Sequence, residues 1–137
     1  MAKTREDIER ELEARGRPYQ VLDDHTIIVP LVPGQAPAML RVEPPVVVMQ
    51  VNIGEVSFTG ETKAVAFYRR LLELNATSLL HAAYGLDKNR VVLTAALELD
   101  NLDVNELEAA LADLALALVE QLPALREMAT AEIKGNG

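Results

Sequence analysis

Hydrophobic and polar positions recur along this chain with two different periods, and the period changes where turn-forming residues occur. Near the start, Ile8 and Leu12 follow one another at helical spacing among charged residues. Thr4 and Asp7 precede them as an N-cap and a first-turn acid, and a glycine and a proline come shortly afterwards. The pattern predicts a first helix from about residue 5 to 15. Only two apolar side chains, Ile8 and Leu12, are available to attach this helix to the rest of the protein.

The next part of the chain, from Tyr19 onwards, has β-branched runs broken by turn residues. The runs read YQVL, HTIIVPLV and VVVMQVNIGEV, with AMLRV extending the pairing. They predict a three-stranded antiparallel meander. Pro30 lies inside the second run and cannot donate to a ladder, so we expect that strand to lie at a sheet edge or to bulge there.

The strand that comes after Pro45 has one wholly apolar face. On its opposite face, Val46 and Val48 alternate with Gln50 and Asn52. A sheet covered on one side only would show a cleanly polar second face. Val46 and Val48 are therefore candidates for contact with another chain, and burial under a loop or the first helix is the alternative.

A second helix should begin at Gly60-Glu61-Thr62 and run to about Thr77. Its apolar stripe is wider than one packing seam needs and consists of Val65, Phe67, Tyr68, Leu71, Leu72 and Leu74.

Asn75 lies near the predicted end of this helix and, with Ala76 and Thr77, has the form of an N-glycosylation acceptor. Asparagine is a weak helix former, tolerates left-handed backbone, and bonds nearby backbone groups through its amide. We therefore predict that Asn75 ends the helix and turns the chain.

The last part of the chain predicts a hairpin followed by a long helix. HAAYG at 81–85 and RVVLTAALEL at 90–99 read as two strands joined by a turn at 86–89. Asp103 and Glu106 form a capping-box pattern, after which leucines recur at spacings of three and four to Leu125. Pro123 should kink or break this helix.

The order of elements predicts one α+β domain over residues 1–137: a helix, a three-stranded antiparallel meander, a helix, a β-hairpin and a long C-terminal helix. Its length suits one domain.

Composition and charge argue against several classes of protein. A formal net charge of −8 disfavours nucleic-acid binding. Nowhere do about 18 consecutive apolar residues occur, as a membrane span requires. The chain has no cysteine and starts with MAKTREDIERELEARG, which lacks the apolar core of a secretory signal, so we expect a cytoplasmic protein. The acidic run from Glu98 to Glu120 is either a solvated helix face or a surface for a basic partner.

Candidate chemistry is sparse. We find no nucleophile with a base, no paired carboxylates in an apolar stretch and no phosphate-cradling glycines. A metal site would require Asp23, Asp24 and His25 to come together with the distant His81. A polar turn before a strand explains the same residues without that requirement. We predict neither a cofactor nor a metal nor catalysis.

A local pattern resembles a known family. It comprises LLELN at 71–75, AAYGLD at 82–87, RVVLTAALELDNLD at 90–103 and a leucine-rich helix. This is similar to the Tir-chaperone (CesT) family of type III secretion chaperones and the related YbjN-type domains, most closely over residues 59–126. The proline-rich span 30–45 and the lack of tryptophan in the last helix depart from the secretion chaperones. A dedicated chaperone and a stand-alone YbjN-type domain are both open.

The resemblance implies a small, acidic, cytosolic homodimer that binds other polypeptides without chemistry. It implies that an extended client segment lies on apolar patches of the sheet and first helix, at Ile8, Leu12, Ile28, Val46 and Val48. The implied dimer contact maps to Phe67, Tyr68, Leu71 and Leu74. Two rival functions are a small-molecule sensor or enzyme with a cleft near His81 and Tyr84, and a purely structural subunit with one fixed partner.

Overall fold

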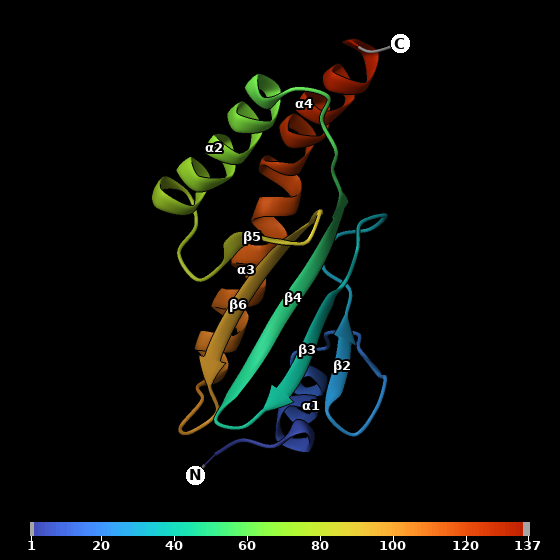
Figure 1. The fold of residues 1–137 in the computed structure, drawn as a ribbon. Helices are drawn as coiled ribbons and strands as arrows, with labels where there is room; N and C mark the ends of the chain where they lie inside the picture. Colours follow the sequence, from blue (N-terminus) through green and yellow to red (C-terminus); the bar gives the residue numbers. More distant parts are fainter. Residues whose placement is uncertain (1, 136–137) are drawn as a thin grey trace.

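A six-stranded antiparallel sheet with helices on one side forms the body of the protein (Figure 1). The computed structural model describes residues 2–135, and side chains for residues 2–129. Within this part of the chain the elements are α1 (Arg5–Ala14), β1 (Gln20–Val21), β2 (Thr26–Val29), β3 (Ala38–Glu43), β4 (Val46–Glu55), α2 (Glu61–Thr77), β5 (Ala83–Asp87), β6 (Arg90–Glu98), α3 (Val104–Glu120) and α4 (Leu122–Gly135). The predicted α+β class and the predicted order of helices and sheet segments are confirmed, but the meander has four strands where three were predicted, because AMLRV forms a strand of its own.

The sheet has the strand order β1-β2-β3-β4-β6-β5, with every neighbour antiparallel. Strands β1 to β4 form the meander, and β5 and β6 form the hairpin. The two parts meet where β4 pairs with β6, from Val46↔Glu98 to Glu55↔Arg90. The chain reaches this pairing only after α2 has carried it past the sheet, so the hairpin returns to lie beside the longest strand of the meander.

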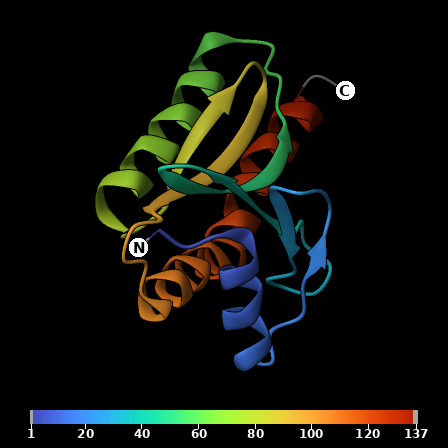
Figure 2. The same cartoon turned by 90° about the horizontal axis from the view of Figure 1, so that it is seen from below.

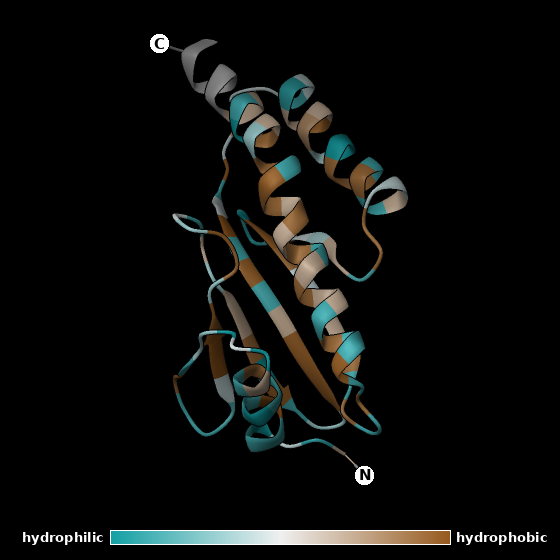
Figure 3. Cartoon of the chain, turned by 180° about the vertical axis from the view of Figure 1, so that it is seen from behind, coloured by the Kyte–Doolittle hydropathy of each residue, from teal (hydrophilic) through white to brown (hydrophobic). Residues whose placement is uncertain are grey.

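Helices α1, α3 and α4 lie on the same face of the sheet, which Figures 2 and 3 show from below and from behind. Helix α2 lies beside β5. The covered face holds the core, where the inward side chains of the strands meet the leucines of α3. Fully buried members of this core include Ile8, Leu12, Ile27, Val29, Leu40, Met49, Leu93, Leu99, Leu107, Leu111, Leu114 and Leu122.

The helix ends are set by their local residues. Thr4 and Asp7 form the capping box of α1, and Gly16 comes after its end with a φ of 66°. Asp103 and Glu106 form the capping box of α3. The C-terminal helix breaks between Glu120 and Leu122, close to Pro123, as predicted from the missing donor of proline.

The expectation for Pro30 was wrong. Strand β2 ends at Val29, so Pro30 lies outside the ladder and takes no donor away from it. The sheet instead carries an irregularity in β4, where the register shifts between Asn52 and Gly54 and Gly54 adopts a φ of 147°. Such bulges bend a strand and change the direction of the residues beyond them.

Helix α1 depends on its two apolar side chains, because Ile8 and Leu12 are 1% and 0% exposed. An ion pair between Arg17 and Glu108, with 2.8 Å between Nη2 and Oε2, joins the segment after α1 to α3. Partly exposed ion pairs contribute little, about 0 to 1 kcal/mol. Burial of the two side chains therefore dominates the attachment of α1.

We expect Leu12→Ala to lower the free energy of unfolding by about 2 to 5 kcal/mol, because it leaves a cavity between α1 and the sheet. Urea denaturation monitored by circular dichroism measures the change. Leu80→Ala is the matched control: Leu80 is 90% exposed, and its truncation should change stability by less than about 0.5 kcal/mol. Equal effects of the two substitutions would contradict this account of α1.

Candidate functional site

One face of the sheet carries none of α1, α3 and α4, and it is the candidate binding surface (Figures 1 and 3). We call it the open face. Strand alternation and register place a row of neighbouring side chains across it, from Ile28 through Met39 and Gln50 to Thr94. A second row runs from Thr26 through Arg41 and Val48 to Ala96, and a third from Glu43 through Val46 to Glu98.

The open face is partly apolar and slightly hollowed. Val46, Val48, Ile28 and Met39 are half-buried by their neighbours on the sheet. A hollow of about 70 Å³ lies among Thr26, Met39, Arg41, Val48 and Gln50. Because α1 lies on the opposite face, the burial of Val46 and Val48 beneath that helix, one of the two interpretations of the sequence, is excluded.

The two edges of the sheet differ. At one edge, β1 has only two residues, and the exposed side chains of Val21 and Leu22 lie at and just after it. At the other edge, the backbone N–H and carbonyl of Tyr84 in β5 point away from β6, and a side chain of α2 already binds both. An unpaired sheet edge is a template for a further strand. Hydrogen-bond partners that the chain itself provides at an edge therefore reduce its availability for pairing.

Asn75 binds the edge of β5. Its Oδ1 accepts the backbone N–H of Tyr84 at 2.7 Å, and its Nδ2 donates to the carbonyl of Tyr84 at 3.1 Å. This pair of bonds reproduces what a neighbouring strand would offer. Asn75 lies two residues before the end of α2 at Thr77, as the sequence predicts, but its amide reaches the next strand and not the helix end itself.

Asp113 binds the segment just before β5. Its Oδ2 accepts backbone N–H groups from Leu80, His81 and Ala82 at 3.2, 2.8 and 2.8 Å. The carboxylate is 9% exposed and belongs to α3. Three donors stabilise a buried charge that would otherwise be costly to desolvate. Sequence reasoning missed this residue, although an aspartate on the buried side of a leucine-rich helix is unusual enough to indicate it.

The acidic run from Glu98 to Glu120 is largely used within the chain. Asp103 and Glu106 cap α3, Glu108 pairs with Arg17, and Asp113 holds the segment before β5. A continuous acidic surface for a basic partner therefore does not follow from this run.

The five positions implied for client contact separate into two groups. Ile28, Val46 and Val48 lie on the open face. Ile8 and Leu12 do not offer a surface, because both are buried in the core beneath α1. The reason is that α1 has no other apolar residue with which to attach itself to the sheet.

The four positions implied for dimer contact also separate. Phe67, Leu71 and Leu74 are 3%, 6% and 4% exposed within the single chain, so their surface is already used. Tyr68 is half-buried and packs against the rings of Phe58 and Phe67, with centroids 5.9 and 5.8 Å apart.

The exposed apolar side chains of α2 are Val65 and Leu72, 59% and 68% exposed. They are seven residues apart, which is two helical turns, so they share one side of the helix. The sequence showed that both residues belong to the wide apolar stripe of this helix. It did not show which side of that stripe faces solvent. On α3, Leu116 and Val119 are exposed in the same way.

His81 and Tyr84 do not form a shared cleft. His81 is exposed, whereas Tyr84 is buried and its phenol donates to Oε1 of Gln121 at 2.6 Å. Burial raises the pKa of Tyr84 to about 12, so the phenol stays neutral. A site near these two residues therefore lacks the geometry that a sensor or an enzyme would need.

Asp23 and His25 form a local turn, in which the backbone N–H of His25 donates to Oδ1 of Asp23 at 2.8 Å. That bond lowers the pKa of Asp23. Within the described part of the chain, no three histidine, aspartate or glutamate side chains are grouped so that they could hold a metal ion. Each helix over residues 2–135 is too short or too polar to cross a lipid bilayer.

We expect Asn75→Ala to lower the free energy of unfolding by about 1 to 3 kcal/mol, because Tyr84 loses both edge partners. Hydrogen exchange should show faster exchange of the Tyr84 amide. Glu73→Ala, two residues earlier on the exposed side of α2, should change stability by less than about 0.5 kcal/mol. A Tyr84 amide that exchanges at the same rate in both variants would contradict the proposed clamp.

Solved structures of similar fold come from several bacteria. A chain of the ExoU–SpcU complex from the type III secretion system of Pseudomonas aeruginosa has 20% identity and a TM-score of 0.66, and the match covers 85% of this chain and 95% of that one. YbjN from E. coli has 14% identity and a TM-score of 0.62, and the match covers 88% of this chain and 96% of YbjN. A chain of the complex of the Yersinia pestis type III secretion chaperone SycH with a fragment of YscM2 has 16% identity and a TM-score of 0.57. The match covers 85% of this chain and 94% of that one.

At these identities the structures establish the shared fold. A comparison with curated protein sequences finds none that matches significantly. A family model, CesT_Tir_1, matches residues 3–131, nearly the whole chain. This protein therefore belongs to the CesT/Tir chaperone family.

Proposed function

We propose that this protein is a non-enzymatic, cytoplasmic chaperone-like homodimer that holds an extended segment of another polypeptide on the open face of its sheet. The observation that carries the proposal is the open face itself, which presents half-buried apolar side chains and is not covered by α1, α3 or α4. Membership of the CesT/Tir family supports it. Several proteins of similar fold are known in complexes with other proteins, including ExoU–SpcU and SycH with YscM2.

The register of the open face suits an extended chain. Ile28, Met39 and Val48 lie on neighbouring strands, so a segment crossing them meets apolar side chains at the spacing of strands. Such a segment can also add backbone pairing at a free sheet edge. The edge at β1 is short and has exposed apolar residues at and just after it, whereas at the other edge Asn75 already binds the outward groups of Tyr84 in β5. We therefore place the client across the open face towards β1.

The client can be found and the site tested in one experiment. A photo-crosslinking amino acid at position 39, activated in cells, is expected to capture a polypeptide whose crosslinked segment mass spectrometry identifies. The same amino acid at position 116, on the exposed side of α3, is the control. Crosslinks to one segment from position 116 but not from position 39 would contradict the open face as the client site.

A synthetic peptide of that segment then measures affinity. Val48→Asp should weaken binding by about tenfold or more, since a carboxylate would be desolvated beneath the peptide. Ala109→Asp adds the same charge on an exposed position of α3 and should leave affinity within about twofold. Equal affinities of the two variants would count against the site.

The homodimer in this proposal uses the exposed side of α2 and not its buried side. In an antiparallel two-fold pairing centred near Tyr68, Val65 of one copy lies opposite Leu72 of the other, and the reverse contact follows by symmetry. Arg69, exposed beside them, then lies near the ring of Tyr68 in the second copy, a favourable contact of a cation with an aromatic face. The pairing covers the apolar side chains that α2 leaves in solvent.

Light scattering after size-exclusion chromatography tests this arrangement. The native chain should elute with twice its mass of 15.0 kDa. Leu72→Glu should give the monomer, because each interface would bury two unpaired carboxylates. Leu116→Glu, a matched change on α3, should remain dimeric. A native protein that stays monomeric at micromolar concentration would refute the homodimer.

A further inference from the structure

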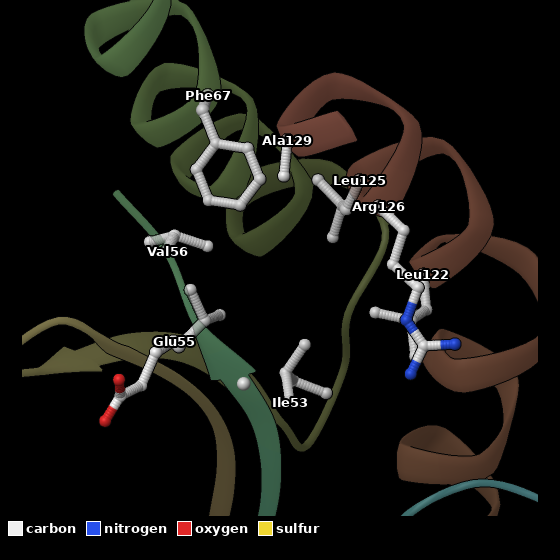
Figure 4. A pocket seen from close by; sticks show the side chains of 10 residues that line it. Ile53, Glu55, Val56, Phe67, Leu122, Leu125, Arg126 and Ala129 are labelled. Carbon is white, nitrogen blue, oxygen red and sulfur yellow. The ribbon is translucent and has the colours of Figure 1, made fainter. Parts of the chain in front are cut away.

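Two concave regions of the protein differ in what they offer a partner. The larger is a recess of about 250 Å³ between the end of β4, α2 and α4, where the irregularity at Gly54 bends the strand (Figure 4). Figure 4 shows the charged groups of Glu55 and Arg126 turned away from its interior. Its floor is only 1% to 3% exposed and consists of Phe67, Val91, Leu122 and Leu125. The recess therefore presents little side-chain surface.

The smaller concave region is the hollow of about 70 Å³ on the open face, over β2, β3 and β4. Its lining belongs to two neighbouring rows of side chains, with Thr26, Arg41 and Val48 in one row and Met39 and Gln50 in the other. The hollow thus lies on the path that we propose for the client, between the β4 side of the open face and β1.

The two long polar side chains of the hollow are held apart by their partners. Nε of Arg41 lies 2.8 Å from Oε1 of Glu43, and Nε2 of Gln50 donates to Oδ1 of Asn52 at 2.8 Å. Each partner lies two residues further along the same strand, on the same face. Because β3 and β4 are antiparallel, Arg41 and Gln50 are drawn towards opposite ends of the sheet. The space between them is the hollow.

The third polar side chain of the hollow is also bonded within the chain. After the backbone N–H of His25, the hydroxyl of Thr26 is the next group that bonds the carboxylate of Asp23 and lowers its pKa. Thr26 therefore offers its methyl group more readily than its hydroxyl. With the methyl groups of Val48 and the thioether of Met39, the hollow favours an apolar occupant.

The volume of the hollow limits the size of that occupant. A dry cavity of about 150 Å³ accommodates benzene, which has six carbons. The hollow has about half that volume, so it has room for three or four carbons. The branched ends of valine, leucine and isoleucine have this size. An aromatic ring exceeds it, and a charged side chain would lose its water without a compensating partner.

We propose that the hollow selects the client through one side chain, by accepting the branched aliphatic end of a valine, leucine or isoleucine and rejecting aromatic and charged side chains. The inference rests on the proposed function, because it requires a polypeptide on the open face. Val48 and Met39 are the residues that determine this specificity, and the bonds of Arg41 and Gln50 keep the hollow open.

A random peptide library displayed on phage, selected on the full chain, tests the preference without knowledge of the natural client. The native chain should enrich peptides that share valine, leucine or isoleucine at one position. Val48→Phe should lose this preference, because its ring takes the place of the client side chain. Val46→Phe is the matched control, since it lies on the same strand and the same face but does not line the hollow, and it should keep the preference.

Affinities of an enriched peptide measure the selection directly by calorimetry. Replacing its shared aliphatic residue by alanine, phenylalanine or aspartate should weaken binding to the native chain by about tenfold or more. The same replacements should change binding to Val48→Phe by less than about twofold. Phenylalanine is a good strand former, so both variants should fold, which circular dichroism checks. If Val48→Phe does not fold, Val48→Met narrows the hollow with a more adaptable side chain.

The possible outcomes separate this inference from the proposed function. Enriched peptides without a shared aliphatic residue, or an equal preference in Val48→Phe and Val46→Phe, would overturn selection by the hollow and leave the open face as a client site. A native chain that enriches no peptide would overturn both. An aliphatic preference that only Val48→Phe loses is the result that we expect.

Discussion

The antiparallel pairing of β4 with β6 is the interaction on which the rest of the structure depends. It joins the meander made by the first half of the chain to the hairpin made by the second half. Without it the chain would contain two small sheets, neither of which could cover the leucine face of α3. Because both strands are long, the joined sheet is broad enough to accept α1 and α3 side by side on one face, and the other face is left open (Figure 2).

The polar groups Asn75 and Asp113 complete this arrangement where hydrophobic contacts cannot. Residues 78–82 turn from α2 into β5 and bring backbone donors close to the core. Asp113 satisfies three of them, and Asn75 satisfies the outward groups of Tyr84. Buried backbone groups without partners are costly, so these side chains are required by the path of the chain. A consequence is that the outward backbone groups of Tyr84 in β5 are already bonded within the chain.

Apolar surface remains in three places, and each has a different character. The open face is broad, shallow and mixed with polar residues, which suits an extended polypeptide. The exposed side of α2 is narrow and self-complementary, which suits a second copy of the chain. The recess between β4, α2 and α4 reaches the buried side chains of Phe67, Leu122 and Leu125 and is also lined by Glu55 and Arg126. These differences in shape, more than the amount of apolar area, separate the proposed roles.

The sequence by itself determined the elements and their order, because helix caps, turn residues and periodicity act over a few neighbouring positions. The capping boxes, the end of α1, the break near Pro123 and the alternation in β4 all follow from such local rules. Only the tertiary structure decided which apolar residues stay in solvent. Ile8, Leu12, Phe67, Leu71 and Leu74 have the same hydrophobicity as residues that remain exposed, and their burial depends on which elements pack together.

The long-range partners of Asn75 and Asp113 were likewise hidden, because the bonds connect residues that only the folded chain brings into contact. The recess arises in the same way, from the bend at Gly54 and the direction of α4. Local chemistry therefore predicted the parts, and the packing of those parts determined which surfaces are left for binding.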